Sequence, residues 1–141
     1  RQMCIRDSGY TEVYVPVMVR EASMWAAAKL PKFGDTMFHD AQEDHWFIPT
    51  AEVPLTLMHM DEILDESALP LKYAAHSPCF RREKVAHGRD VRGIKRVFQF
   101  EKVELYQFTK PEESPAALEA MLHEAEMLLQ ELELTSLHHL T

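Results

Sequence analysis

Residues 71–80 read LKYAAHSPCF, and residues 96–105 read RVFQFEKVEL. The second stretch alternates cleanly, with Val97, Gln99, Glu101, Val103 and Leu105 on one face and Arg96, Phe98, Phe100, Lys102 and Glu104 on the other. A repeat of two residues is typical of a β-strand, and the two stretches together predict a long hairpin around a basic loop at 82–93. Because a packed core rarely combines Arg, Phe and Glu on one face, we interpret the second face as one that binds a ligand.

Positive charge is concentrated around this hairpin. Residues 81–102 contain eight Lys or Arg and three acidic residues, within a chain of 141 residues whose net charge is −8. The acidic total argues against a general nucleic-acid binder. A basic cluster inside an acidic chain favours a local site for phosphates, and a solvated basic loop is the alternative interpretation.

The composition is that of an ordinary soluble protein, with 46% hydrophobic and 27% charged residues, and the length fits one domain or part of one. No apolar run approaches the roughly 20 residues of a membrane span. The two cysteines, Cys4 and Cys79, are too few for a disulfide scaffold and fit a reducing compartment. The eight histidines are scattered and form no HExxH. We therefore predict a cytoplasmic protein with no membrane association and no metal ligands of its own.

The rest of the sequence predicts short strands and helices without a βαβ alternation. Strands are expected at 10–15, 37–38 and 45–48, and helices at 20–29, 53–63 and from Ser114 onward. Ser114 is the predicted N-cap of the last helix, with Pro115 at its first helical position. Its apolar stripe from Leu118 to Leu132 predicts packing against a core, with a partner-binding helix as the alternative. These elements together predict an α+β domain with an antiparallel sheet and flanking helices.

Four segments resemble a known family. Residues 80–104 read FRREKVAHGRDVRGIKRVFQFEKVE, which is similar to motif 2 of class II aminoacyl-tRNA synthetases, and specifically of seryl-tRNA synthetases, whose pattern is roughly FRxEAGxxGxDxRGxxRxHQFxKVE. Residues 9–16 resemble motif 1 with its proline, residues 48–56 (IPTAEVPLT) resemble the TxE loop, and residues 30–33 (LPKF) resemble a further family stretch. The resemblance extends from about Gly9 to Leu134.

The resemblance implies a class II synthetase fold, here incomplete, and the activity of a serine–tRNA ligase. Such an enzyme uses ATP and Mg²⁺ to activate L-serine as seryl adenylate, and then transfers the seryl group to tRNA(Ser). The resemblance also implies a homodimer organised around the motif-1-like segment at 13–19, where strand pairing would stop at Pro16.

For ATP binding, the resemblance assigns four residues. Arg81 would hold the α-phosphate and Arg96 would lie near the terminal phosphates, which makes both catalytic. Glu83 would accept a hydrogen bond from the adenine amino group, and Phe100 would stack on the adenine. The chemistry agrees, because charge builds on phosphate oxygens during adenylate formation and the arginine fork binds two such oxygens at once. A surface ion pair between Arg81 and Glu83 is the structural alternative.

For serine binding, the resemblance assigns Thr50 and Glu52 to the ammonium group, Arg81 to the carboxylate and Glu104 to the side chain. A buried polar pocket that satisfies a hydroxyl group strongly rejects an amino acid that lacks one. The alternative for Glu52 is an acidic residue that stabilises a helix N-terminus, and both interpretations are compatible.

Some positions depart from the family pattern. Lys84-Val85 replaces Ala-Gly, Phe98 replaces His, and Leu57 replaces Asn. We expect a divergent or foreign N-terminus at 1–8, a partial catalytic domain at 9–134 and a divergent tail at 135–141. Because no motif 3, no acidic metal-binding segment and no N-terminal helical arm is recognisable, we expect the middle of a catalytic domain. We expect the Mg²⁺ ligands to lie elsewhere and this chain alone to be inactive.

Two other functions fit the same motifs. One is a synthetase-like ligase that charges a carrier protein with an amino acid. The other is a non-catalytic relic of a synthetase that dimerises or binds nucleotide. An upstream helical pair in the flanking reading frame would favour the tRNA enzyme over the carrier-protein ligase, and motif 3 would argue against the relic.

Overall fold

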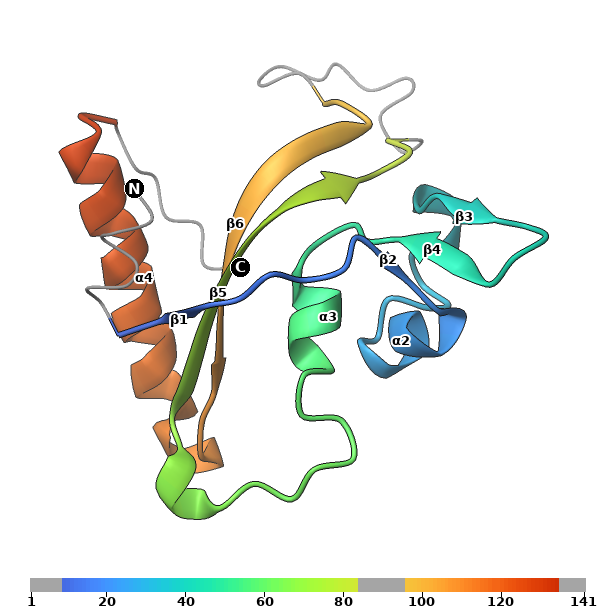
Figure 1. The fold of residues 1–141 in the computed structure, drawn as a ribbon. Coiled ribbons are helices and arrows are strands. Elements are labelled where there is room, and N and C mark those ends of the chain that lie inside the picture. Colours follow the sequence, from blue (N-terminus) through green and yellow to red (C-terminus); the bar gives the residue numbers. More distant parts are fainter. Residues whose placement is uncertain (1–8, 84–95, 135–141) are drawn as a thin grey trace.

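The computed structural model describes residues 9–83 and 96–134. At its centre, two long curved strands, β5 (Leu71–Phe80) and β6 (Gln99–Phe108), form an antiparallel hairpin (Figure 1). The predicted hairpin is confirmed, although the second strand begins three residues later than the alternation indicated and continues to Phe108. The even-numbered residues of β6 are the more shielded near its start, and the odd-numbered ones are exposed.

A third strand, β1 (Thr11–Glu12), pairs with β5 in the parallel direction, so the sheet order is β1-β5-β6. The strand expected at 10–15 is therefore shorter than its apolar pattern indicated, with one further backbone hydrogen bond from Val13 to Ala74 at 2.8 Å. The parallel pair was not predicted, because a local pattern carries no information about which distant strand is the partner.

A second, small antiparallel sheet lies beside the hairpin and has the order β2-β4-β3 (Figure 1). Its strands are β2 (Met18–Val19), β4 (His45–Phe47) and β3 (His39–Asp40). The strand predicted at 37–38 is wrong by two residues, because the chain first makes a 3₁₀ turn, η1 (Gly34–Thr36), which leaves Met37 in the core. The Asp40 carboxylate accepts hydrogen bonds from the backbone N–H groups of Gln42 and Glu43, and these lower its pKa.

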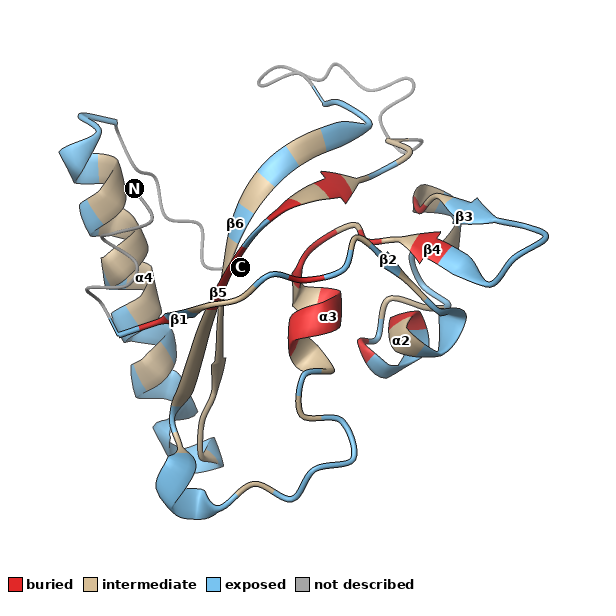
Figure 2. Ribbon diagram, viewed as in Figure 1, coloured by how far each residue is buried: buried red, intermediate tan, exposed pale blue. Residues whose placement is uncertain are grey.

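Two short helices, α2 (Glu21–Ala26) and α3 (Glu52–Thr56), contact each other; α2 also packs against β4, and α3 against β6 (Figure 1). Buried residues from these helices, from the strands and from the connections between them form two clusters, which are coloured red in Figure 2. One cluster contains Met24, Ala27, Met37, Trp46, Ile48 and Val53, and the other contains Val15, Ala51, Leu55 and Ala75. The helices predicted at 20–29 and 53–63 are both too long. The second ends at Thr56. Met60 and Ile63 are exposed, so these two residues do not pack against a core in the described part of the chain.

The chain between α3 and β5 includes a 3₁₀ turn, η2 (Glu66–Ala68), where the Asp65 carboxylate accepts from the backbone N–H and the hydroxyl of Ser67. After β6, the 3₁₀ turn η4 (Pro111–Glu113) leads into α4 (Ser114–Glu131). The N-cap of α4 is Glu113, one residue before the predicted Ser114, and it makes no side-chain capping bond.

Helix α4 lies on the sheet without a buried residue, and its outer side is exposed (Figure 2). Leu118, predicted to pack in the core, is 56% exposed, so full core packing of the stripe is wrong. Polar contacts fasten the helix: the Tyr10 hydroxyl donates to Glu124 at 2.8 Å, and Lys72 lies 3.6 Å from the same carboxylate. Burial, followed by the Glu124 hydrogen bond, raises the pKa of Tyr10 to about 12.

Within 9–83 and 96–134, no helix has the length and apolarity required to cross a membrane. The predicted divergent ends at 1–8 and 135–141 and the Lys84-Val85 departure lie outside the described residues.

Candidate active site

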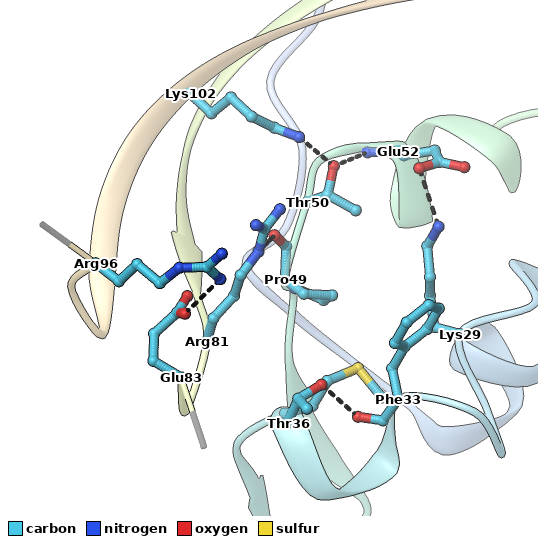
Figure 3. A pocket seen from close by; sticks show the side chains of 11 residues that line it. Lys29, Phe33, Thr36, Pro49, Thr50, Glu52, Arg81, Glu83, Arg96 and Lys102 are labelled. Carbon is cyan, nitrogen blue, oxygen red and sulfur yellow. Dashed lines mark hydrogen bonds and ion pairs between the residues drawn. The ribbon is translucent and has the colours of Figure 1, made fainter. Parts of the chain in front are cut away.

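A cavity of about 410 Å³ opens at the free end of the β5–β6 hairpin (Figure 3). Three segments contribute to its wall: the turns after α2, the connection from β4 to α3, and the two strands of the hairpin with their flanking residues. The lining residues are Lys29, Phe33, Thr36, Met37, Pro49, Thr50, Glu52, Arg81, Glu83, Arg96 and Lys102. Four cationic side chains and two carboxylates thus face one space, which suits a ligand that carries negative charge.

Backbone hydrogen bonds fix this end of β5 against all of its neighbours. The N–H groups of Phe80, Arg81 and Arg82 donate to the carbonyl groups of Ile48, Phe98 and Thr36, each at 2.9 Å. The strand end is therefore tied to β4, to the start of β6 and to the η1 turn at the same time. A side chain at position 81 is held by backbone geometry at the point where the three segments meet.

Arg81 lies at this meeting point. Its Nε donates to the Pro49 carbonyl at 3.2 Å, and its guanidinium carbon lies 5.1 Å from the ring centroid of Phe100. The carbonyl bond and the aromatic contact orient the guanidinium, while most of its five N–H donors stay available for a ligand. Phe100 itself does not line the cavity.

Glu83 and Arg96 form an ion pair beside Arg81 (Figure 3), with Arg96 Nη1 3.1 Å from Glu83 Oε2. The Glu83 side chain is largely shielded, and that of Arg96 is largely exposed. Glu83 also has a φ of 51°, in the left-handed region that costs a non-glycine residue about 1 kcal/mol or more. Glu83, which the resemblance assigned to adenine, and Arg96, which it assigned to the terminal phosphates, therefore form an ion pair with each other.

Thr50 is buried and connects two charged side chains of β6. Its hydroxyl donates to Glu104 Oε2 at 2.5 Å and accepts from Lys102 Nζ at 2.5 Å, and Lys102 and Glu104 also form an ion pair. Glu104, assigned to the serine side chain, does not line the cavity, whereas Lys102 and Thr50 do. Lys102 was missed as a site residue, although the alternation had placed it on the same face as Phe100 and Glu104.

Glu52 begins α3 and pairs with Lys29, whose Nζ lies 3.0 Å from Glu52 Oε2. Both side chains line the cavity, and Glu52 is also the first residue of α3, so the helix position is confirmed and serine binding by Glu52 stays a prediction. Lys29 was also missed. It comes from the turn that follows α2, and no periodic pattern there points to Glu52.

Within the described ranges, no group of three or more His, Cys, Asp or Glu residues could hold a metal ion. The two cavity carboxylates each contact a cation already. These residues do not fit a Mg²⁺ site, which requires carboxylates and water around the ion.

A curved antiparallel hairpin with arginines at its free end, beside a Thr-x-Glu loop, defines a class II aminoacyl-tRNA synthetase core. Residues 35–141 match the family described as "tRNA synthetase class II core domain (G, H, P, S and T)", and the chain belongs to this family. Its named relatives are serine–tRNA ligases. The chain is 52% identical over 129 residues to that of Dehalococcoides mccartyi (strain CBDB1), covering 92% of this chain and 31% of the relative. It is 57% identical over 118 residues to that of Roseiflexus sp. (strain RS-1), covering 84% and 28%.

Two solved structures have the same fold. Seryl-tRNA synthetase from Pyrococcus horikoshii, complexed with ATP, matches with a TM-score of 0.86 and 43% identity, covering 94% of this chain and 30% of that one. The cytoplasmic serine–tRNA ligase from Naegleria fowleri, in complex with AMP, matches with a TM-score of 0.81 and 34% identity, covering 92% and 31%. The family and fold expected from the motifs are therefore confirmed. This chain spans 28–31% of the length of these four relatives.

Proposed function

We propose that this chain is the adenylate-forming part of a serine–tRNA ligase. It binds ATP and L-serine, forms seryl adenylate, and supplies the seryl group that is transferred to tRNA(Ser). One observation carries the proposal: a single cavity gathers Arg81 and Arg96 from the hairpin and Thr50 and Glu52 from the connection between β4 and α3. Its relatives include an enzyme solved with ATP and another solved with AMP.

On the ATP side, a serine carboxylate oxygen attacks the α-phosphate and pyrophosphate leaves. Arg81 holds the α-phosphate and the attacking carboxylate, because its oriented fork meets two oxygens at once. Arg96 turns from Glu83 to the terminal phosphates, where the bond to a more highly charged acceptor is stronger. Glu83, released from Arg96, accepts a hydrogen bond from the adenine amino group, and the adenine stacks on Phe100.

On the serine side, the ammonium group binds at Thr50 and Glu52. Only Oε2 of Glu52 contacts Lys29, so Oε1 is available to a ligand. Glu104 accepts the serine hydroxyl after a small rotation from Thr50. A site whose buried polar groups require a hydroxyl partner discriminates strongly against alanine.

Mg²⁺ bound with the triphosphate would neutralise part of its negative charge. Since the described residues offer no metal site, we place its ligands on other segments of the protein. The same reasoning predicts that the 141-residue chain alone does not form adenylate at a useful rate.

The test is a chimaeric ligase. The matched 129-residue segment of the Dehalococcoides mccartyi enzyme is replaced by that of this chain, and serine-dependent ATP–pyrophosphate exchange is measured. Retention of exchange and of tRNA(Ser) charging is expected. Loss of serine-dependent exchange in a folded chimaera contradicts the proposal, and exchange without tRNA charging limits the role to amino acid activation.

We also propose a cytoplasmic homodimer, organised around residues 13–19. Met18 and Val19 pair with β4 inside the chain, but Tyr14 is 96% exposed. An exposed aromatic side chain between the partly buried Val13 and the buried Val15 is typical of a surface that another chain covers. The Naegleria relative is named as cytoplasmic, which supports the proposed location.

A further inference from the structure

Lys29 and Glu52 lie together at the side of the cavity where we propose that the amino acid binds (Figure 3). The Lys29 side chain is 17% exposed and that of Glu52 is 43% exposed, so the lysine is the more firmly enclosed partner. The backbone N–H of Lys29 donates to the Met24 carbonyl at 2.8 Å, which anchors the residue to the end of α2. An ammonium group is thus held 3.0 Å from the carboxylate proposed to bind the ammonium group of the substrate.

We propose that Lys29 determines specificity by making the site select a zwitterionic amino acid over an amine without a carboxylate. This inference rests on the proposed function, since it assumes that an amino acid binds at Glu52. Lys29 acts here as a positioning and charge-balancing residue, and it is assigned no part in the chemical step.

The argument begins with net charge. Glu52 without a partner would attract any primary amine, including small amines that resemble serine. With Lys29 beside it the pair is neutral, and the remaining lining contains Arg81, Arg96 and Lys102 against Glu83. A ligand with only positive charge is therefore repelled. A zwitterion also carries a carboxylate, to which Arg81 can donate hydrogen bonds.

The second part of the argument is geometry. Lys29 occupies Oε2 of Glu52 and leaves Oε1 without a hydrogen bond from the described residues. A carboxylate held at one oxygen presents the other in a fixed direction, which suits a single ammonium donor. Two substitutions separate the effect of charge from that of orientation. Lys29→Gln keeps a hydrogen-bond donor but removes the positive charge, whereas Lys29→Arg keeps both the donor and the charge.

The experiment uses the chimaeric ligase and two probes in the exchange assay, serine as substrate and ethanolamine as competitor. The measured quantity is the ratio of the ethanolamine inhibition constant to the serine KM. Both molecules use Glu52, so a general loss of structure changes both constants and largely cancels in the ratio. Removing one positive charge a few ångströms from the amine is expected to lower the ratio on the order of tenfold in Lys29→Gln.

Lys29→Arg is expected to keep the ratio within about threefold of the parent. Lys32→Met is the matched control, because Lys32 lies in the same turn with its Nζ 5.3 Å from the Phe33 ring centroid and does not line the cavity. An unchanged ratio in an active Lys29→Gln enzyme overturns the inference alone. A parent chimaera without serine-dependent exchange overturns the proposed function and the inference with it.

Discussion

Thr50 and Glu104 are 54 positions apart in sequence, yet the Thr50 hydroxyl donates a 2.5 Å hydrogen bond to the Glu104 carboxylate. The bond joins the β4–α3 connection to the middle of β6, and Lys102 binds the same hydroxyl from the other side. The loop that carries Glu52 is thereby fixed relative to the strand that carries Phe100. This side-chain link adds to the backbone hydrogen bonds that Ile48 makes with Val17 and Phe80.

Thr50→Val should therefore lower kcat/KM for serine in the exchange assay by roughly 10- to 100-fold. Valine has the shape of threonine but leaves Glu104 and Lys102 without their shared hydroxyl, and an unmade buried hydrogen bond to a charged group is costly. Thr50→Ser retains the hydroxyl and is the control, with activity expected within about threefold of the parent. Equal activities of the valine and serine variants would argue against a role for this hydrogen bond.

Arg81→Ala should reduce serine-dependent pyrophosphate exchange on the order of 100-fold or more without unfolding the protein. The reason is the loss of an oriented cation at the α-phosphate, and loss of one such electrostatic contact typically has this effect. Arg82→Ala is the neighbouring control, since Arg82 is held through its backbone N–H and does not line the cavity. Exchange by Arg81→Ala within about threefold of the parent would exclude the catalytic role.

The hairpin and the family could be predicted because each is encoded in short stretches of sequence. Alternation from Arg96 to Leu105 identifies a strand, and ordered motifs identify a family without knowledge of contacts. The same alternation placed Lys102 beside Phe100 and Glu104, so Lys102 was within reach of the sequence argument. The length of α3 could not be predicted in this way. Helical spacing at Met60 and Ile63 does not reveal whether a neighbouring element is present to bury them.

Ion pairs in the cavity could not be predicted either. Lys29 lies 23 positions from Glu52, and their contact depends on how α2 packs beside α3. Glu83 and Arg96 lie 13 positions apart, on the two sides of the basic loop. The resemblance to motif 2 gave the two residues separate ligand roles, and nothing in that motif indicates that their side chains contact each other.

Tyr14→Glu should weaken the proposed homodimer. Tyr14 lies in the segment at 13–19 and is almost fully exposed in the single chain, so a buried carboxylate there would face a desolvation penalty without a partner. Sedimentation of the chimaeric ligase at micromolar concentration is expected to show a dimer, and the variant is expected to shift toward monomer. Ile63→Glu changes an exposed apolar residue outside this segment and should leave the dimer intact. A monomeric parent, or equal dissociation of both variants, would exclude this interface.

Tyr10 should make the folded chain less stable as the pH rises above 10. Its hydroxyl donates to Glu124 and accepts from Gln107 Nε2 at 2.6 Å, and its pKa is raised from 10.0 to about 12. Since the unfolded chain loses this proton near pH 10 and the folded chain keeps it until about pH 12, the contribution is fully present below pH 10 and is lost as the pH rises between these values. The free energy of unfolding decreases by about 2–3 kcal/mol at most through this group. Urea unfolding of the chain at pH 9 and pH 11.5 is expected to show a smaller decrease for Tyr10→Phe than for the parent, while Tyr14→Phe, at an exposed position, should behave like the parent. A decrease of the same size in Tyr10→Phe would show that other groups cause the alkaline instability.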